Sequence, residues 1–263
     1  MPAGTIHSRR RSLGQGLAAD WHAGDCLAGA EGYAMSKAHF SPGELAKMIV
    51  PRMGGAVVVL AAVFFLPAGT FDYWEAWVYI ALLMVPAVFL MSYLARNDPA
   101  LMERRTRMKE RELQQRRIVS LSFVWFLAMF LLPGFDRRFE WSDVPVWLVI
   151  AADLLIALGY LLVALVYREN TYASRVVEVE KGQTVISTGP YAIVRHPMYL
   201  GVIGMYFFTP LALGSYWALI PALAIFPILV ARIRNEEAVL ARDLPGYAEY
   251  MQKVRWRLIP GVW

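Results

Sequence analysis

The chain has 263 residues, of which 58% are hydrophobic and 18% are charged, and its formal net charge is +5. Soluble domains carry about a quarter charged residues, and the apolar residues here stand in long blocks between short charged loops, so the composition favours an integral membrane protein. The basic residues lie beside these blocks, which argues against nucleic-acid binding, and the single cysteine, Cys26, excludes an intramolecular disulfide and a multi-cysteine metal site.

The first segment, residues 1–34, is rich in Gly and Ala and shows neither a helical nor a strand period, so we predict a disordered N-terminal extension. No apolar run follows its arginines, as a signal peptide would require. We hypothesise that Met35 is the natural start. The sequence Ser41-Pro42-Gly43-Glu44 then predicts a helix start, with serine as the cap and proline at the first helical position.

Four apolar blocks follow and predict membrane-spanning helices over residues 52–66, 73–94, 118–132 and 146–167. Lipid offers no hydrogen bonds to the backbone, so each block must be helical. The loop between the second and third blocks is strongly basic and is therefore predicted to be cytoplasmic; its basic residues are Arg104, Arg105, Arg107, Lys109, Arg111, Arg116 and Arg117. Within the fourth block, we interpret Asp153 as a partner in a helix–helix hydrogen bond or as a protonated acid.

The last apolar block, residues 199–233, is too long for one span, and Gly214-Ser215 breaks it. We therefore expect a helical hairpin that begins and ends on the cytoplasmic side. The predicted fold is an all-α, polytopic transmembrane bundle of about five to six membrane segments. Residues 35–188 would form transmembrane helices and cytoplasmic loops, and residues 189–263 a catalytic and cofactor-binding region whose C-terminal part lies along the cytoplasmic surface.

Two polar clusters bracket the predicted hairpin. The first runs from Gly189 to Gly201, where Pro197 suits the first helical position and places His196 at a helix N-terminus, which favours anions. Gly201 and Gly204 allow a close approach to one helix face.

The second cluster lies on the other side of the hairpin. Arg232 and Glu236 are four residues apart and share a helix face, whereas Glu237 points about 100° away, so the two acids need not have the same role. After a turn at Pro245-Gly246, Tyr247 and Tyr250 belong to an apolar helical stripe, a pattern that more often indicates packing than ligand contact.

These clusters resemble the isoprenylcysteine carboxyl methyltransferases and the related phospholipid methyltransferases. The similarity is closest over residues 189–263, and three motifs carry it: Arg195-His196-Pro197-x-Tyr199-x-Gly201, the pair Glu236-Glu237, and Leu244-Pro245-Gly246-Tyr247 with the following Tyr250 and Arg257-Leu258-Ile259-Pro260. The resemblance implies a bacterial-type membrane enzyme that uses S-adenosylmethionine without a Rossmann domain. No Gly-x-Gly-x-x-Gly turn follows a strand pattern in this chain, in agreement with that expectation.

The resemblance also implies roles for individual residues. By its pattern we assign His196, Tyr199, Gly201, Glu236 and Glu237 to the cofactor pocket, and Arg232 and Glu236 to catalysis. Arg232 could orient an acceptor carboxylate through two hydrogen bonds, and Glu236 would be the natural base if the acceptor were an amine. The expected acceptor is a lipid-attached or amphiphilic molecule, with isoprenylcysteine-type carboxylate O-methylation favoured. We expect no metal, and a bacterial inner-membrane location with both termini and the active site cytoplasmic.

Simpler interpretations remain open for each residue. Arg232 and Glu236 could form an ion pair at a helix end, His196 could cap a helix, and Gly201 with Gly204 could form a packing groove. Arg195 and Arg234 could anchor helices at lipid headgroups. The rival functions are a membrane NADPH-dependent sterol or steroid reductase, against which Glu236-Glu237 argues, and a non-catalytic membrane protein of the same fold.

Overall fold

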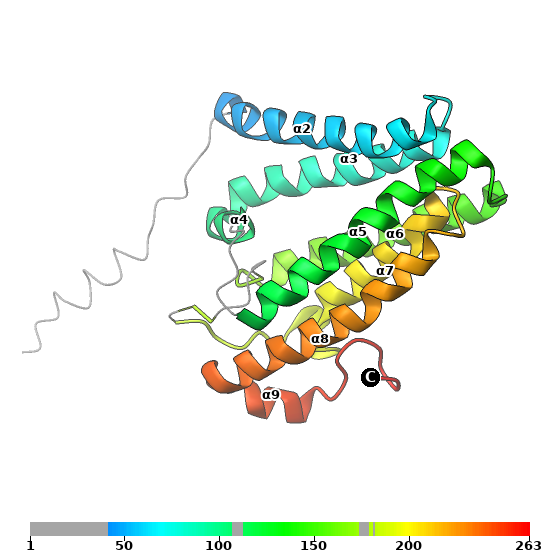
Figure 1. The fold of residues 1–263 in the computed structure, drawn as a ribbon. Helices are drawn as coiled ribbons and strands as arrows, with labels where there is room; N and C mark the ends of the chain where they lie inside the picture. The colour runs from blue at the N-terminus through cyan, green and yellow to red at the C-terminus, as the bar shows by residue number, and fades with distance from the viewer. Residues whose placement is uncertain (1–41, 107–112, 174–178, 181) are drawn as a thin grey trace, which may run out of the picture. The chain divides into compact units, whose positions relative to one another are not determined.

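The computed structural model describes residues 42–106, 113–173, 179–180 and 182–263. These residues belong to one compact unit that runs from Ala38 to Trp263. The predicted extension over residues 1–34 lies outside them. The described residues form the helices α2 (Pro42–Ala68), α3 (Trp74–Asn97), α4 (Pro99–Thr106), α5 (Leu113–Phe139), α6 (Val146–Glu169), α7 (Pro197–Ala212), α8 (Leu219–Asp243) and α9 (Tyr247–Lys253), with a short 3-10 helix, η1 (Gly189–Ala192). The all-helical fold class is confirmed (Figure 1).

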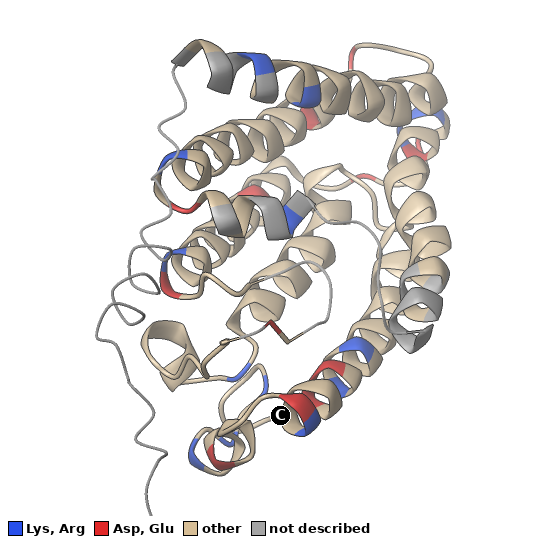
Figure 2. Cartoon of the chain, turned by 90° about the vertical axis from the view of Figure 1, so that its left-hand side faces the viewer, with Lys and Arg blue, Asp and Glu red and all other residues tan. Residues whose placement is uncertain are grey.

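Three described helices are long and apolar enough to cross a membrane: Ile49–Ala68 within α2, Trp74–Asn97 and Val146–Glu169. They correspond to the first, second and fourth predicted spans. Charged residues lie mainly at helix ends and in loops (Figure 2). Helix α7 is a shorter apolar helix. The chain is therefore a helical membrane bundle, while the count of five to six segments stays a prediction.

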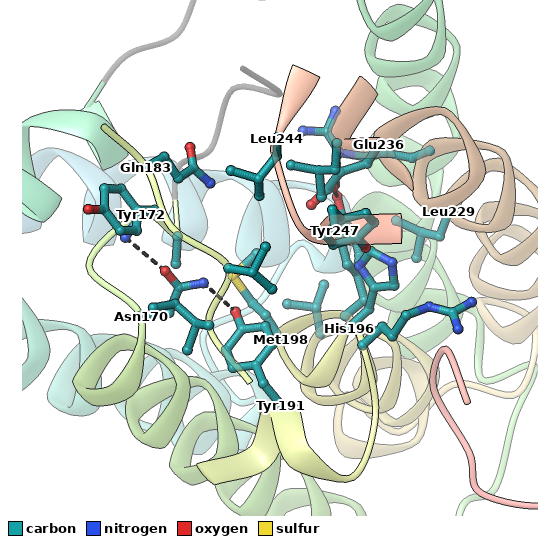
Figure 3. Close-up of a pocket in the computed structure, with 18 of the residues that line it drawn as sticks. Asn170, Tyr172, Gln183, Tyr191, His196, Met198, Leu229, Glu236, Leu244 and Tyr247 are labelled. Carbon is teal, nitrogen blue, oxygen red and sulfur yellow. Dashed lines mark hydrogen bonds between the residues drawn. The ribbon is translucent and has the colours of Figure 1, made fainter. Parts of the chain in front are cut away.

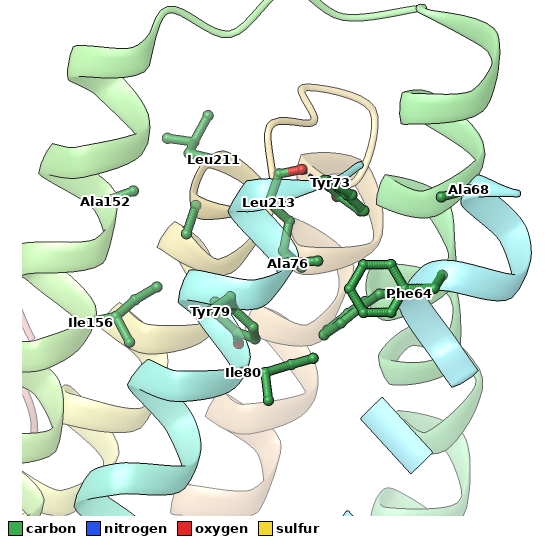
Figure 4. Close-up of a cluster of buried hydrophobic side chains, with 12 residues drawn as sticks. Phe64, Ala68, Tyr73, Ala76, Tyr79, Ile80, Ala152, Ile156, Leu211 and Leu213 are labelled. Atoms are coloured by element: carbon green, nitrogen blue, oxygen red, sulfur yellow. Dashed lines mark hydrogen bonds between the residues drawn. The ribbon is translucent and has the colours of Figure 1, made fainter. Parts of the chain in front are cut away.

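The largest cluster of buried apolar side chains joins α2, α3, α6 and the end of α7 (Figure 4). Phe64 is fully buried there and meets the ring of Tyr79 edge-on, with the ring centroids 5.9 Å apart. Two tyrosine hydroxyls in this cluster are satisfied across the bundle: Tyr79 pairs with the Thr209 hydroxyl at 2.7 Å, and Tyr73 donates to the Leu213 carbonyl at 2.5 Å. These bonds connect α3 to the end of α7 at the start of the hairpin turn.

The connection between the third and fourth predicted spans is short, because α5 continues to Phe139 and α6 begins at Val146. Asp136, near the end of α5, is only 1% exposed. Its Oδ2 accepts hydrogen bonds from Ser142, at 2.7 Å, and from Ser215 in the hairpin turn. A buried carboxylate needs such donors, so Asp136 joins the end of α5 to the connection between α7 and α8.

The predicted hairpin is present. Helix α7 begins at Pro197, as the proline predicts, and ends at Ala212, after which Gly214 adopts a positive φ of 69° in the turn to α8. Helix α7 packs most extensively against α6. A Cβ built on Gly201 would lie 2.9 Å from the Gly159 carbonyl oxygen, whereas one on Gly204 would meet nothing within 4 Å. The close approach is therefore between Gly201 and Gly159, not along a Gly201–Gly204 groove.

A buried ion cluster attaches the C-terminal segment to the hairpin. Glu237 of α8 is 5% exposed and accepts hydrogen bonds from Arg195 Nε and Arg257 Nε, both at 2.7 Å. His196 Nε2 lies 3.2 Å from Glu237 Oε1, and since a carboxylate only accepts, this nitrogen carries the proton. The backbone amides of Arg195 and His196 donate to the carbonyls of Trp256 and Arg257, each at 2.9 Å.

This environment shifts the pKa of Glu237. Burial alone would raise the pKa, but the hydrogen bonds from His196, Arg195 and Arg257 lower it from 4.5 to about 2. Because the folded pKa lies below the unfolded value, the cluster stabilises the fold above about pH 4.5 and loses this contribution as the pH falls toward 2.

The contact between α6 and α7 can be tested with a matched pair of glycine substitutions. We expect Gly201→Ala to lower the midpoint of thermal unfolding in detergent, because its Cβ would press on the Gly159 carbonyl; overpacking of this kind costs about 1–3 kcal/mol. Gly204→Ala lies on the same helix, receives the same gain in helix propensity and meets no neighbour. Equal stability of the two variants would contradict the contact.

The ion cluster predicts a pH-dependent loss of stability. Glu237→Gln should destabilise the fold by about 3 kcal/mol at neutral pH, because it leaves the buried Arg195 guanidinium without its carboxylate. The difference from the wild type should shrink as the pH falls from about 4.5 toward 2, measured as unfolding midpoints across that range. Glu249→Gln removes an exposed carboxylate and serves as the control. A loss that does not vary with pH would refute the account.

Candidate functional site

A cavity of about 620 Å³ lies where α7 begins and α8 ends. Its lining comes from α4, α5, the segment that follows α6, η1, α7, α8 and α9. This volume falls within the range of about 300–1,000 Å³ that is typical of small-molecule sites. Figure 3 shows Asn170, Tyr172 and Gln183 on one side and Tyr247, His196 and Glu236 on the other. The cavity thus joins the two polar clusters that bracket the hairpin.

A chain of hydrogen bonds connects α7 and α8 at this cavity. The Tyr199 hydroxyl donates to Glu236 Oε2 at 2.6 Å and accepts from Arg232 Nε at 3.0 Å. Tyr199 is itself 7% exposed, and its ring meets His196 edge-on, with the centroids 5.7 Å apart. Arg232 and Glu236 therefore share one helix face, as predicted, and Tyr199 holds both in place.

The segment after α6 forms a second polar wall. Asn170 donates from Nδ2 to the Tyr191 hydroxyl and accepts from the Tyr172 amide, both at 2.9 Å (Figure 3). Tyr250 of α9 donates to the Tyr191 carbonyl oxygen at 2.7 Å. Burial raises the pKa of Tyr250 to about 12, although the nearby Arg195 opposes the shift, and burial also raises the pKa of Tyr191. These hydroxyls thus stay protonated near neutral pH.

Another part of the lining is apolar. It includes Phe123 and Phe126 of α5, Val202 of α7 and Leu229 of α8. Phe126 packs edge-on against Tyr206, with the ring centroids 4.7 Å apart. One cavity therefore combines hydrogen-bonding groups with a hydrocarbon surface.

Four of the site residues predicted from the sequence line this cavity: His196, Tyr199, Arg232 and Glu236. The structure places the other two elsewhere. Gly201 faces Gly159 of α6, and Glu237 lies in the ion cluster next to the cavity. Both are outside its lining.

Sequence reasoning also missed residues of the lining. Asn170 stands in a stretch with no distinctive motif, and Tyr191, within the first polar cluster, was given no role, although both line the cavity. Tyr247 and Tyr250 pack with Leu244 in a buried apolar cluster, as interpreted from the sequence, and they also line the cavity. The Tyr247 hydroxyl is buried and has no hydrogen-bond partner among the described residues. Burial raises the pKa of Tyr247, so this hydroxyl stays a donor, and no described residue accepts from it. The resemblance in Leu-Pro-Gly-Tyr was the only signal that pointed to it.

Arg195 does not anchor the protein at lipid headgroups, as one interpretation allowed. It is only 6% exposed. Its Nη1 donates to the carbonyls of Val254 and Arg255, at 2.8 and 3.0 Å, in addition to the Glu237 contact. Arg195 therefore positions the C-terminal segment.

Two relatives match parts of the chain. The cobalt-zinc-cadmium resistance protein CzcN of Cupriavidus metallidurans is 35% identical over 135 residues, which cover 49% of this chain and 57% of that protein. The nickel-cobalt-cadmium resistance protein NccN of Alcaligenes xylosoxydans xylosoxydans is 28% identical over 118 residues, which cover 43% of this chain and 52% of that protein. The chain thus spans little more than half the length of these curated relatives. Its described residues include no group of three or more His, Cys, Asp or Glu that could hold a metal ion.

A family comparison covers the segment that builds most of the cavity. Residues 147–245 match the phospholipid methyltransferase family model. The matched range contains α6, α7 and α8 and includes His196, Tyr199, Arg232 and Glu236. This match confirms the resemblance inferred from the sequence motifs, and residues 147–245 carry the pattern of the phospholipid methyltransferase family.

Proposed function

We propose that this protein transfers a methyl group from S-adenosylmethionine to a lipid-attached or amphiphilic acceptor, with O-methylation of an isoprenylcysteine-type carboxylate favoured. The observation that carries the proposal is one cavity whose lining combines polar groups, at Tyr199, Arg232 and Glu236, with apolar side chains of α5, α7 and α8. The methyl donor is water-soluble and the acceptor has a hydrocarbon tail, so a cavity that binds both must offer polar and apolar surfaces. The family match over residues 147–245 supports a membrane methyltransferase.

The polar groups of the lining suit S-adenosylmethionine, which carries ribose hydroxyls and an amino group. Glu236 can accept hydrogen bonds from ribose hydroxyls or from the amino group. Within the described part of the chain its Oε2 is bound to Tyr199, which fixes the orientation of the carboxylate. Tyr247 also lines the cavity, and its buried hydroxyl has no hydrogen-bond partner among the described residues, which costs about 1–3 kcal/mol.

The residues of the chain contribute by positioning. When bound, S-adenosylmethionine supplies an electrophilic methyl group. Tyr199 holds the Arg232 guanidinium and the Glu236 carboxylate on one side of the cavity, and Arg232 can orient an acceptor carboxylate with two hydrogen bonds. The apolar lining at Phe126, Val202 and Leu229 excludes water from the transfer. Orientation of the reacting groups, rather than proton transfer, should provide most of the acceleration.

Arg105 supports a proposal for the side of the membrane that the cavity faces. This arginine belongs to the strongly basic connection between α3 and α5, and it lines the cavity. Basic connections of this kind stay in the cytoplasm. We therefore propose that the cavity faces the cytoplasm of a bacterial inner membrane, where S-adenosylmethionine is available.

Transfer of an isotopically labelled methyl group tests the proposal directly. The purified protein, incubated with bacterial membranes and labelled S-adenosylmethionine, should place the label in material that extracts with lipids or with lipid-modified peptides, detected by mass spectrometry. Glu236→Gln should weaken S-adenosylmethionine binding at least about tenfold, because it removes a charge-assisted hydrogen bond, and should leave the unfolding midpoint unchanged. Binding of NADPH in place of S-adenosylmethionine would overturn the proposal in favour of a reductase.

Arg232 should act on the acceptor more than on the methyl donor. We expect Arg232→Ala to reduce the turnover number about a hundredfold, because the acceptor loses its orientation, while the dissociation constant of S-adenosylmethionine changes little. Turnover and binding are measured on the same preparation. Equal losses in both quantities would place Arg232 among the residues that bind the cofactor.

A further inference from the structure

Arg105 lines the cavity, and the packing of its helix fixes the position of Arg105. It belongs to α4, whose first turn is capped by Asp98: the Asp98 Oδ1 accepts from the Leu101 amide at 2.9 Å. Leu101 is fully buried and Met102 is 8% exposed, and both pack in a cluster with Val163, Val166 and Tyr167 of α6. Helix α4 is therefore docked on the end of α6, and Arg105 reaches the cavity from a fixed helix.

Among the described residues, the contacts of the Arg105 guanidinium are with neutral groups, and they include a side-chain hydrogen bond with Tyr167. Its Nη1 lies 4.0 Å from the Met198 sulfur, and its Cζ lies over the Tyr167 ring, 5.0 Å from the centroid. No carboxylate of a described residue is within ion-pair distance of it. A guanidinium carries five N–H donors, and a sulfur atom and an aromatic face use few of them. Arg195, in contrast, is bound to Glu237 and to backbone carbonyls.

Arg105 brings a positive charge to the lining of the cavity. The other two arginines of the described lining bind protein groups: Arg195 binds Glu237, and Arg232 binds the Tyr199 hydroxyl. A guanidinium in a partly apolar cavity attracts an anion, and arginine binds carboxylates and phosphates through two parallel hydrogen bonds.

Arg105 and Arg232 approach the cavity from different directions. Arg105 contacts Met198, and Arg232 contacts Tyr199, the next residue of α7. Consecutive residues of an α-helix point about 100° apart, so the two arginines serve different parts of the cavity. The oxyanion that Arg105 binds is therefore not the acceptor carboxylate that we assign to Arg232. The two groups belong either to two ligands or to two parts of one ligand.

We propose that Arg105 is an oxyanion-binding residue, which binds a carboxylate or a phosphate of a ligand in this cavity. The inference rests on the proposed function and specifies it. Two ligands could supply the oxyanion: the amino-acid carboxylate of S-adenosylmethionine, or an anionic headgroup on the acceptor. In either case, the basic connection that contains Arg105 has a role in ligand binding beyond its effect on membrane topology.

Binding measurements on the full-length protein in detergent test the proposal and separate the two sources. The variants are Arg105→Gln, which removes the charge, and Arg105→Lys, which keeps the charge but loses the paired hydrogen bonds. Arg96→Gln is the matched control, because Arg96 is an exposed arginine near the end of α3. The probes are two pairs: S-adenosylmethionine with its decarboxylated analogue, and N-acetyl-S-farnesylcysteine with its methyl ester.

If Arg105 binds the cofactor carboxylate, Arg105→Gln should weaken S-adenosylmethionine binding about tenfold and leave the decarboxylated analogue unaffected. If it binds the acceptor, the same loss should occur for N-acetyl-S-farnesylcysteine and not for the ester. Arg105→Lys should show a smaller loss, and Arg96→Gln none.

Unchanged binding of both carboxylate-bearing probes by Arg105→Gln would overturn the proposal, as would an equal loss for the two members of each pair. A wild-type protein that binds the anionic amphiphile through Arg105 but does not bind S-adenosylmethionine would refute the methyltransferase and retain the oxyanion site. Binding of neither probe by the wild type would refute both.

Discussion

Glu237 is the group on which the arrangement of the cavity depends. A carboxylate buried to 5% exposure requires charged donors, and its donors come from the start of α7 and from the C-terminal segment. The cluster therefore brings three parts of the chain together at the end of α8. Glu236 is the next residue back along the helix, about 100° away, and is turned toward the cavity. The two adjacent acids therefore have different roles: Glu237 holds the segments around the cavity together, and Glu236 lines the cavity.

At the other end of the bundle, hydrogen bonds fix the position of the hairpin turn. Asp136 bonds to the hairpin turn through Ser215, and Tyr73 bonds to the Leu213 carbonyl. Between the two ends, the contact of Gly201 with Gly159 lets α7 lie directly on α6. The hairpin is therefore held at its turn, along its first helix and at its polar end. A cavity that opens between such fixed elements can keep Tyr199, Arg232 and Glu236 in register without a bound ligand.

Much of this fold could be predicted from local patterns. The apolar blocks, Pro197 and the break at Gly214 predict helices and a hairpin, because lipid, proline and glycine act on the residues where they stand. The helical period also separates Glu236 from Glu237. The partners of Glu237, however, could not be predicted, because Arg195 and Arg257 lie 42 and 20 residues away in the sequence. The same limit explains why the contact of Gly201 with Gly159 and the places of Tyr247 and Arg105 in the cavity lining were not predicted.

One cavity between the two ends of the hairpin requires that both ends lie on the same side of the membrane. Membrane-impermeant maleimide can test this in oriented vesicles, on variants Ile193→Cys and Arg242→Cys in a Cys26→Ser background, because both positions are exposed. We expect the reagent to modify both positions from the same side of the membrane and neither position from the opposite side. Modification of the two positions from opposite sides would show that no common cavity exists.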